Sequence, residues 1–171
     1  MPVSQNLLPE FDEEMKNTRK LLECVPDGKF DYKPHPKSMS LGQLAVHVAQ
    51  MPSWAATTMD VELLEFGPDF KPTVANSRAE LLEMFDKGLA DARPKISAAS
   101  DADWEKIWTL KFGGKTILSM PRAAVMRSTV VNHMIHHRAQ LGVYLRLNQV
   151  AIPGMYGPSA DEAAAWDAAS A

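Results

Sequence analysis

Apolar residues recur at spacings of three and four in four stretches of the chain, which is the pattern of helices with one buried face. We expect these helices at about residues 4–24, 40–58 and 77–96, and from near 119 to about 148. The second and third open with SLGQ and SRAE, where a serine is followed three residues later by Gln or Glu. That spacing is typical of a capping box at a helix start. Pro94 is expected to limit how far the third helix continues.

An alternating pattern replaces the helical one between the third and fourth helices. Trp108, Leu110 and Phe112 alternate with polar residues, and Gly113–Gly114 follows. Paired glycines tolerate the positive φ angles of a two-residue turn, so the sequence predicts a short β-hairpin. The fold class expected is all-α, an antiparallel four-helix bundle with a small β-hairpin insertion before the last helix, in a single domain over residues 1–171. The turn-rich, then Ala-rich tail (residues 151–171) is expected to pack loosely over this bundle.

Composition narrows the class of protein. The 171 residues are 46% hydrophobic and 23% charged with a net charge of -3, which fits one globular domain and gives no reason to expect nucleic-acid binding. No basic run indicates a membrane surface, and no stretch approaches the roughly 18 apolar residues of a membrane span. Cys24 is the single cysteine, and the acidic N-terminal segment does not resemble a signal peptide. We therefore expect a cytoplasmic protein.

Three of the five histidines fall in the stretch NHMIHHRAQ at residues 132–140. His133 and His137 are four residues apart, which places them on one helix face, and both replace members of the apolar stripe. His47 occupies the stripe of the second helix, and metal sites in bundles are commonly built from facing helices. His35, in a proline-rich loop, is an alternative third donor, and His133 with His136 is an alternative pair. Inward histidines that are hydrogen-bonded and metal-free are the simpler interpretation of the same pattern.

A three-histidine site has a definite chemical consequence. Structural zinc sites are closed by four protein ligands, whereas three ligands leave a position open for water or substrate. An open metal site lowers the pKa of a bound water or thiol. Imidazole is a suitable ligand for zinc, nickel, iron and copper, so the residues alone do not select the metal.

Two segments resemble the DinB-like superfamily of bacterial stress-associated proteins. They are KPHPKSMSLGQLAVHVA and the later SMPRAAVMRSTVVNHMIHHRAQLGVYLRLNQVAIPGMYGPSADE, and the resemblance covers nearly the whole chain. It implies a four-helix bundle, usually a homodimer, with a divalent metal held by three histidines. Carried over to this chain, the ligands are His47, His133 and His137, and Zn or Ni is the expected metal.

The resemblance also implies a class of function. Some members resemble thiol S-transferases that use a low-molecular-weight thiol such as bacillithiol or mycothiol, and others are described as metal-dependent hydrolases. We expect a metal-dependent thiol S-transferase acting on a small-molecule substrate. A metal-dependent hydrolase and a non-catalytic metal-binding stress protein are the alternatives. Because the sequence offers no clear general base, the thiol route is favoured.

Four further residues near the histidine pair are candidates for the site. His136 is a candidate proton shuttle or a surface residue, and Arg138 a contact for an anionic substrate or an arginine facing solvent or a dimer interface. Gln140 is expected to orient a ligand or to be a packing amide. Tyr144 is expected to be a hydrogen-bond donor at the cavity or a core residue. Tryptophans, including Trp54, are expected either to line a substrate cavity or to belong to the core.

Overall fold

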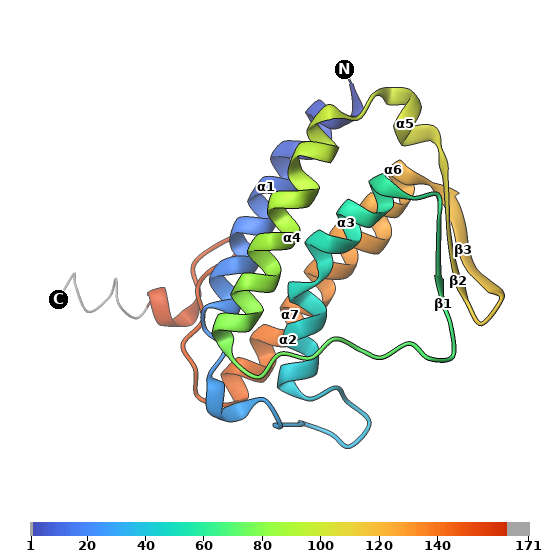
Figure 1. Ribbon diagram of the computed structural model, residues 1–171. Coiled ribbons are helices and arrows are strands. Elements are labelled where there is room, and N and C mark those ends of the chain that lie inside the picture. The colour runs from blue at the N-terminus through green and yellow to red at the C-terminus, as the bar shows by residue number, and fades with distance from the viewer. Residues whose placement is uncertain (1, 164–171) are drawn as a thin grey trace.

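The computed structural model describes residues 2–163 and shows a mostly helical fold with a small three-stranded sheet to one side (Figure 1). The helices are α1 (Val3–Leu22), α2 (Leu41–Ala49), α3 (Met51–Asp60), α4 (Arg78–Ala98), α5 (Asp101–Glu105), α6 (Arg122–Val125) and α7 (His133–Leu147), with a 3₁₀ turn η1 (Asp27–Lys29) and a π-helical segment η2 (Met126–Asn132). The strands are β1 (Leu63–Phe66), β2 (Ile107–Phe112) and β3 (Lys115–Pro121).

Helix starts follow the capping signals of the sequence. Ser40 and Gln43 form the full capping box at α2. Ser77 accepts the amide of Glu80 at the start of α4, but the Glu80 carboxylate accepts the amide of Asn76 instead of completing the box. Each serine thus satisfies a backbone donor that the first helical turn leaves without a partner.

Two prolines that lie within helices are Pro52 and Pro94. The second predicted helix is divided at Gln50 into α2 and α3, and Pro52 lies in the first turn of α3, where its missing amide needs no partner. The expectation that Pro94 limits the third helix is wrong, because α4 continues through it to Ala98. The Pro94 ring lies exposed on the helix surface.

The last predicted helix is built from three consecutive pieces. It begins at Arg122 rather than near residue 119, since Ser119 and Met120 belong to β3. The middle piece, η2, is a π-helix, and π-helical segments are rare and frequently adjoin functional sites. Here it ends directly before His133.

The sheet confirms the predicted hairpin and adds a strand. β2 and β3 are antiparallel, and Gly113 and Gly114 join them with φ of 53° and 79°. β1 pairs in parallel with β2, with Leu63 opposite Thr109, giving the order β1-β2-β3. The alternating pattern that predicted the hairpin does not extend to this strand of only four residues.

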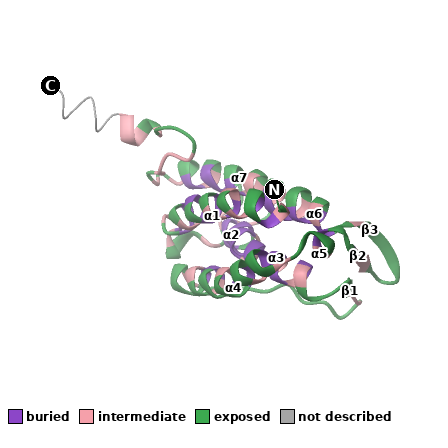
Figure 2. Ribbon diagram, turned by 90° about the horizontal axis from the view of Figure 1, so that it is seen from above, coloured by how far each residue is buried: buried purple, intermediate pink, exposed green. Residues whose placement is uncertain are grey.

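Buried residues lie on the inward faces of the helices (Figure 2). α4 packs against α1 and α3, and α2 packs against α7. Trp104 and Trp108 are fully enclosed in the fold, whereas Trp54 is half-buried with its ring 5.9 Å from that of Phe66. No helix in the described part of the chain is long and apolar enough to span a membrane.

The segment after α7 is attached by specific contacts. Arg146 forms an ion pair of 2.6 Å with Asp161, whose carboxylate also accepts the amide of Ile152. Asn17 of α1 donates a hydrogen bond to the carbonyl of Met155. The expectation of loose packing is therefore wrong for residues 151–163, and the remainder of the predicted tail lies outside the described residues.

Candidate metal centre

His47, His133 and His137 converge on one point between α2 and α7. His47 lies in the last turn of α2, His133 opens α7, and His137 lies one turn later. The Nε2 atom of His133 is 3.3 Å from that of His47 and 2.8 Å from that of His137. All three side chains are half-buried, and one nitrogen from each lies within 4.8 Å of the other two.

The second nitrogen of both α7 histidines is held by an oxygen acceptor. The carbonyl oxygen of Thr129 lies 3.2 Å from Nδ1 of His133, and Oε1 of Gln140 lies 2.8 Å from Nδ1 of His137. An oxygen acceptor requires the proton to be on Nδ1, and a neutral imidazole carries only one proton. Each Nε2 therefore presents a lone pair to the other.

This arrangement fits a metal ion. Two lone pairs facing each other at 2.8 Å repel unless a positive charge lies between them. Imidazole nitrogens that share one metal, each about 2.0–2.1 Å from it, are separated by about 2.9–3.4 Å for octahedral to tetrahedral angles. The two measured separations fall close to that range, and held Nδ1 protons are the usual arrangement around metal-binding histidines.

The environment also favours the neutral form of the His47 and His137 rings. Burial lowers the pKa of His47 from its ordinary value to about 4, and the neighbouring His137 and His133 rings add to the effect. Burial lowers the pKa of His137 as well, although its hydrogen bond to Gln140 acts in the opposite direction. Neutral imidazole is the form that binds metals, so the site is ready for a cation at neutral pH.

The alternative donors lie elsewhere. His35 is exposed in the loop before α2, where its Nδ1 accepts the amide of Lys37. Nε2 of His136 lies 3.1 Å from the Gln140 amide nitrogen and does not join the group. Among the described residues, no carboxylate oxygen or thiol comes within reach of the three nitrogens as a further ligand.

Gln140 links two histidines through its single side-chain amide. Its oxygen accepts from His137 and its nitrogen donates to His136. This geometry favours a role for Gln140 in orienting the candidate metal ligand His137 over a role as a packing amide. His136 itself is exposed and touches the triad only through Gln140 and the edge of the His137 ring.

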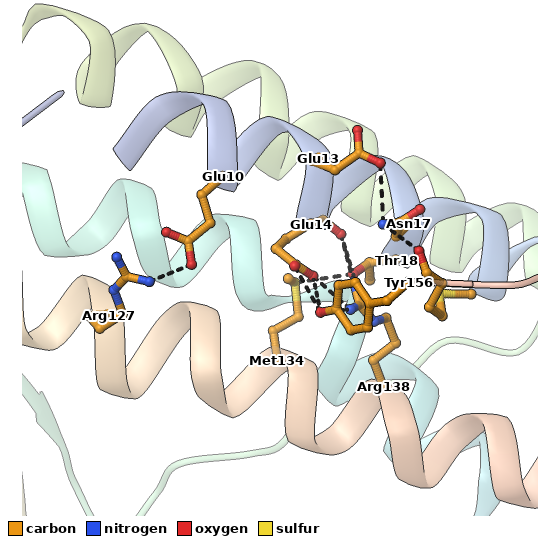
Figure 3. Close-up of polar contacts among 10 residues, drawn as sticks. Glu10, Glu13, Glu14, Asn17, Thr18, Arg127, Met134, Arg138 and Tyr156 are labelled. Atoms are coloured by element: carbon orange, nitrogen blue, oxygen red, sulfur yellow. Dashed lines mark hydrogen bonds and ion pairs between the residues drawn. The ribbon is translucent and has the colours of Figure 1, made fainter. Parts of the chain in front are cut away.

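Arg138 lies away from the triad, in a buried polar cluster shown in Figure 3. It is 2% exposed, forms a 2.6 Å ion pair with Glu14 of α1, and donates to Thr18. The hydroxyl of Tyr156 accepts from Arg138 and donates to Glu14, which fastens the segment after α7 to the helices. The expectation that Arg138 faces solvent is wrong, because a charge this well enclosed requires the partner that Glu14 supplies.

Tyr144 is also directed away from the triad. Its hydroxyl donates to the carbonyl of Met39 at 3.4 Å, and its ring packs edge-on against Tyr32. It thus attaches the loop that precedes α2 to α7 and reaches no histidine.

Three residues that hold the candidate ligand His133 or the buried Arg138 in place were not predicted from the sequence. They are Thr129, Glu14 and Tyr156. The carbonyl of Thr129 belongs to η2, and nothing in the sequence indicates a π-helix there. Glu14 and Tyr156 are 142 positions apart. A glutamate among the buried positions of α1 is the one signal that pointed to an enclosed charge.

Comparisons with known proteins place the chain in a family. The model of the DinB family matches residues 1–168, so the chain belongs to the DinB family. The uncharacterized protein YrdA of Bacillus subtilis (strain 168) is 24% identical over 165 residues, covering 92% of this chain and 90% of YrdA.

Two solved structures share the fold. A DinB-like protein from Bacillus cereus ATCC 10987 has a TM-score of 0.67 at 22% identity, over 89% of this chain and 97% of that one. The DinB-like protein YjoA from Bacillus subtilis has a TM-score of 0.65 at 16% identity, over 88% of this chain and 96% of that one. At these identities the likeness establishes the DinB-like fold.

Proposed function

We propose that this DinB-family protein is a metal-dependent thiol S-transferase that joins a low-molecular-weight thiol to a small electrophilic substrate. The observation that carries the proposal is the convergence of three Nε2 atoms, two of them with their Nδ1 protons held by oxygen acceptors. Three neutral nitrogens leave coordination positions for an exogenous ligand, as in catalytic rather than structural sites. Zn or Ni is the metal we propose, since imidazole suits both.

In this proposal the three histidines hold the metal ion, and Thr129 and Gln140 orient two of their rings. A divalent ion bound here lowers the pKa of a thiol so that the thiolate is available at neutral pH. Thr129 and Gln140 fix the ring orientations of His133 and His137, so the nitrogens need no rearrangement on binding. All three side chains are half-buried, so the nitrogens are neither fully exposed to bulk water nor fully enclosed.

Hydrolysis is the second candidate reaction. It requires a group to accept a proton from water, and no carboxylate joins the triad within residues 2–163. His136 is a titratable side chain beside the triad, and it contacts His137 through Gln140 and through the edge of the ring. The thiol route needs no such base, which is why we place it first.

A direct assay distinguishes these activities. Protein loaded with Zn or Ni is mixed with L-cysteine and with larger cysteine-containing thiols, and conjugation to monochlorobimane is followed by fluorescence. We expect metal-dependent conjugation in the wild type and in His35→Ala, and none above background in His133→Ala. Ester hydrolysis without conjugation would favour the hydrolase, and metal binding with neither activity would favour a non-catalytic metal-binding protein. The homodimer stays a prediction, which the mass of the protein in solution tests.

A further inference from the structure

A cavity of about 600 Å³ lies where the ends of α3, α4 and α5 meet the start of α6. None of the three histidines lines it. Arg122 and His133 are eleven positions apart along α6, η2 and α7, or about 15 Å along a helical axis. The cavity is therefore a separate feature from the metal centre.

Arg122 is an enclosed charge without a counter-charge. It is 5% exposed, and its Nη2 donates to the carbonyl of Val61 at 3.2 Å. Its Nε has no hydrogen-bond acceptor, and no carboxylate oxygen of the described residues lies within 4.0 Å of the guanidinium. An isolated buried charge costs several kcal/mol, which an anion bound beside it would offset. Arg138 is the contrast, since Glu14 neutralises it.

The other charges on the cavity wall are already engaged or exposed. Lys95 forms an ion pair of 2.5 Å with Asp60, and Lys106 forms one of 2.7 Å with Asp103. Glu62 is exposed and does not reach the guanidinium. Among the described residues that line the cavity, Arg122 is thus the positive charge left to receive a ligand. A polyanion would meet three carboxylates on the wall, so a ligand with a single negative charge fits best.

We propose that this cavity binds a small organic monocarboxylate, with its carboxylate on Arg122 and its apolar part against Met59 and Ala98. The planar guanidinium matches the two oxygens of a carboxylate and retains donors that Val61 does not use. Met59, Ala98 and Ala99 are the apolar part of the wall, and the volume lies within the range of small-molecule sites. The proposal does not depend on the reaction at the metal centre.

Hexanoate is the probe, titrated into ¹⁵N-labelled full-length protein and followed by NMR. We expect a Kd of about 1 mM, as befits a fragment-sized ligand, with shifts at the amides of Asp60, Ala98 and Lys106. Arg122→Met should weaken binding about tenfold or more, because it removes the charged partner. Ala98→Trp should block the cavity while keeping Arg122. The matched control Arg78→Met, at the far end of α4, should bind like the wild type.

Any result that differs from these expectations contradicts the proposal. Unchanged binding in Arg122→Met contradicts the proposal. The absence of binding to the wild type also contradicts it, and would follow if Glu62 closed over Arg122. Hexanol binding as tightly as hexanoate, or inorganic phosphate binding more tightly, contradicts the carboxylate class. Should Arg122→Met fail to fold, the Ala98→Trp titration decides alone, and undiminished binding there contradicts the assigned place.

Discussion

His133 and His137 face each other through Nε2 atoms 2.8 Å apart, while the Nδ1 of each is held by an oxygen acceptor. When both rings are neutral with the proton on Nδ1, neither ring has a proton left to donate across the gap, so a hydrogen bond between the rings does not account for the contact. A metal ion between the rings would resolve the contact between the lone pairs, and His47 offers a third nitrogen from the facing helix.

Gln140 should tune metal affinity without contacting the metal. Gln140→Leu removes the acceptor that fixes His137, and loss of such an outer hydrogen bond typically weakens metal affinity about 10–100-fold. Gln140→Glu keeps an oxygen acceptor and should retain affinity close to the wild type. Competition with a fluorescent zinc chelator measures both. Equal affinities for the Leu and Glu variants would show that Gln140 does not position His137.

The buried ion pair of Glu14 and Arg138 should matter for stability rather than for activity. Arg138→Met leaves the Glu14 carboxylate enclosed without its partner, which we expect to cost about 3–5 kcal/mol in the free energy of unfolding. The double variant with Glu14→Gln should recover a large part of this loss. Urea denaturation of the two variants measures the difference.

An exposed pair provides the control for that comparison. Arg93 and Asp12 are 2.8 Å apart at the surface, so Arg93→Met should cost far less stability than Arg138→Met. A loss for Arg138→Met as small as that for Arg93→Met would contradict the assigned role of the buried pair.

Acid should destabilise the metal-free protein through His47. Its pKa is about 4 in the folded state against 6.5 ordinarily, so below pH 6.5 the unfolded chain binds a proton that the folded one does not. The stability associated with a neutral His47 is complete above pH 6.5 and is lost as the pH falls toward 4. After allowance for partial exposure, we expect a loss on the order of 1–2 kcal/mol.

Thermal unfolding at pH 7 and pH 4.5 tests this sign. The melting temperature of the wild type should fall more than that of His47→Gln, which lacks the titrating ring. An equal fall in the two proteins would assign the acid sensitivity to other groups.

Much of the site was predictable from helical spacing. His133 and His137 replace apolar residues four positions apart, and His47 does the same in the preceding stripe, so one-dimensional periodicity selected the three side chains that the fold brings together. The hairpin was predictable for a similar reason, because Gly113–Gly114 interrupts an alternating pattern. These features depend on local sequence, which periodicity captures.

Features that depend on distant partners were not predictable. Arg138 follows His137 directly in the chain, yet the helical turn of about 100° per residue carries it toward Glu14 on α1. β1 forms because β2 offers it an edge, not because of a pattern of its own. The π-helix η2 has no residue signature in its sequence, although its Thr129 carbonyl orients a candidate ligand.

Elemental analysis of the purified protein, beside His133→Ala and the loop control His35→Ala, tests the central claim most directly. We predict close to one equivalent of divalent metal in the wild type and in His35→Ala, and almost none in His133→Ala. Chelation should lower the melting temperature only of the proteins that bind metal. A wild-type protein that carries no metal and takes up neither Zn nor Ni when they are added would contradict the account.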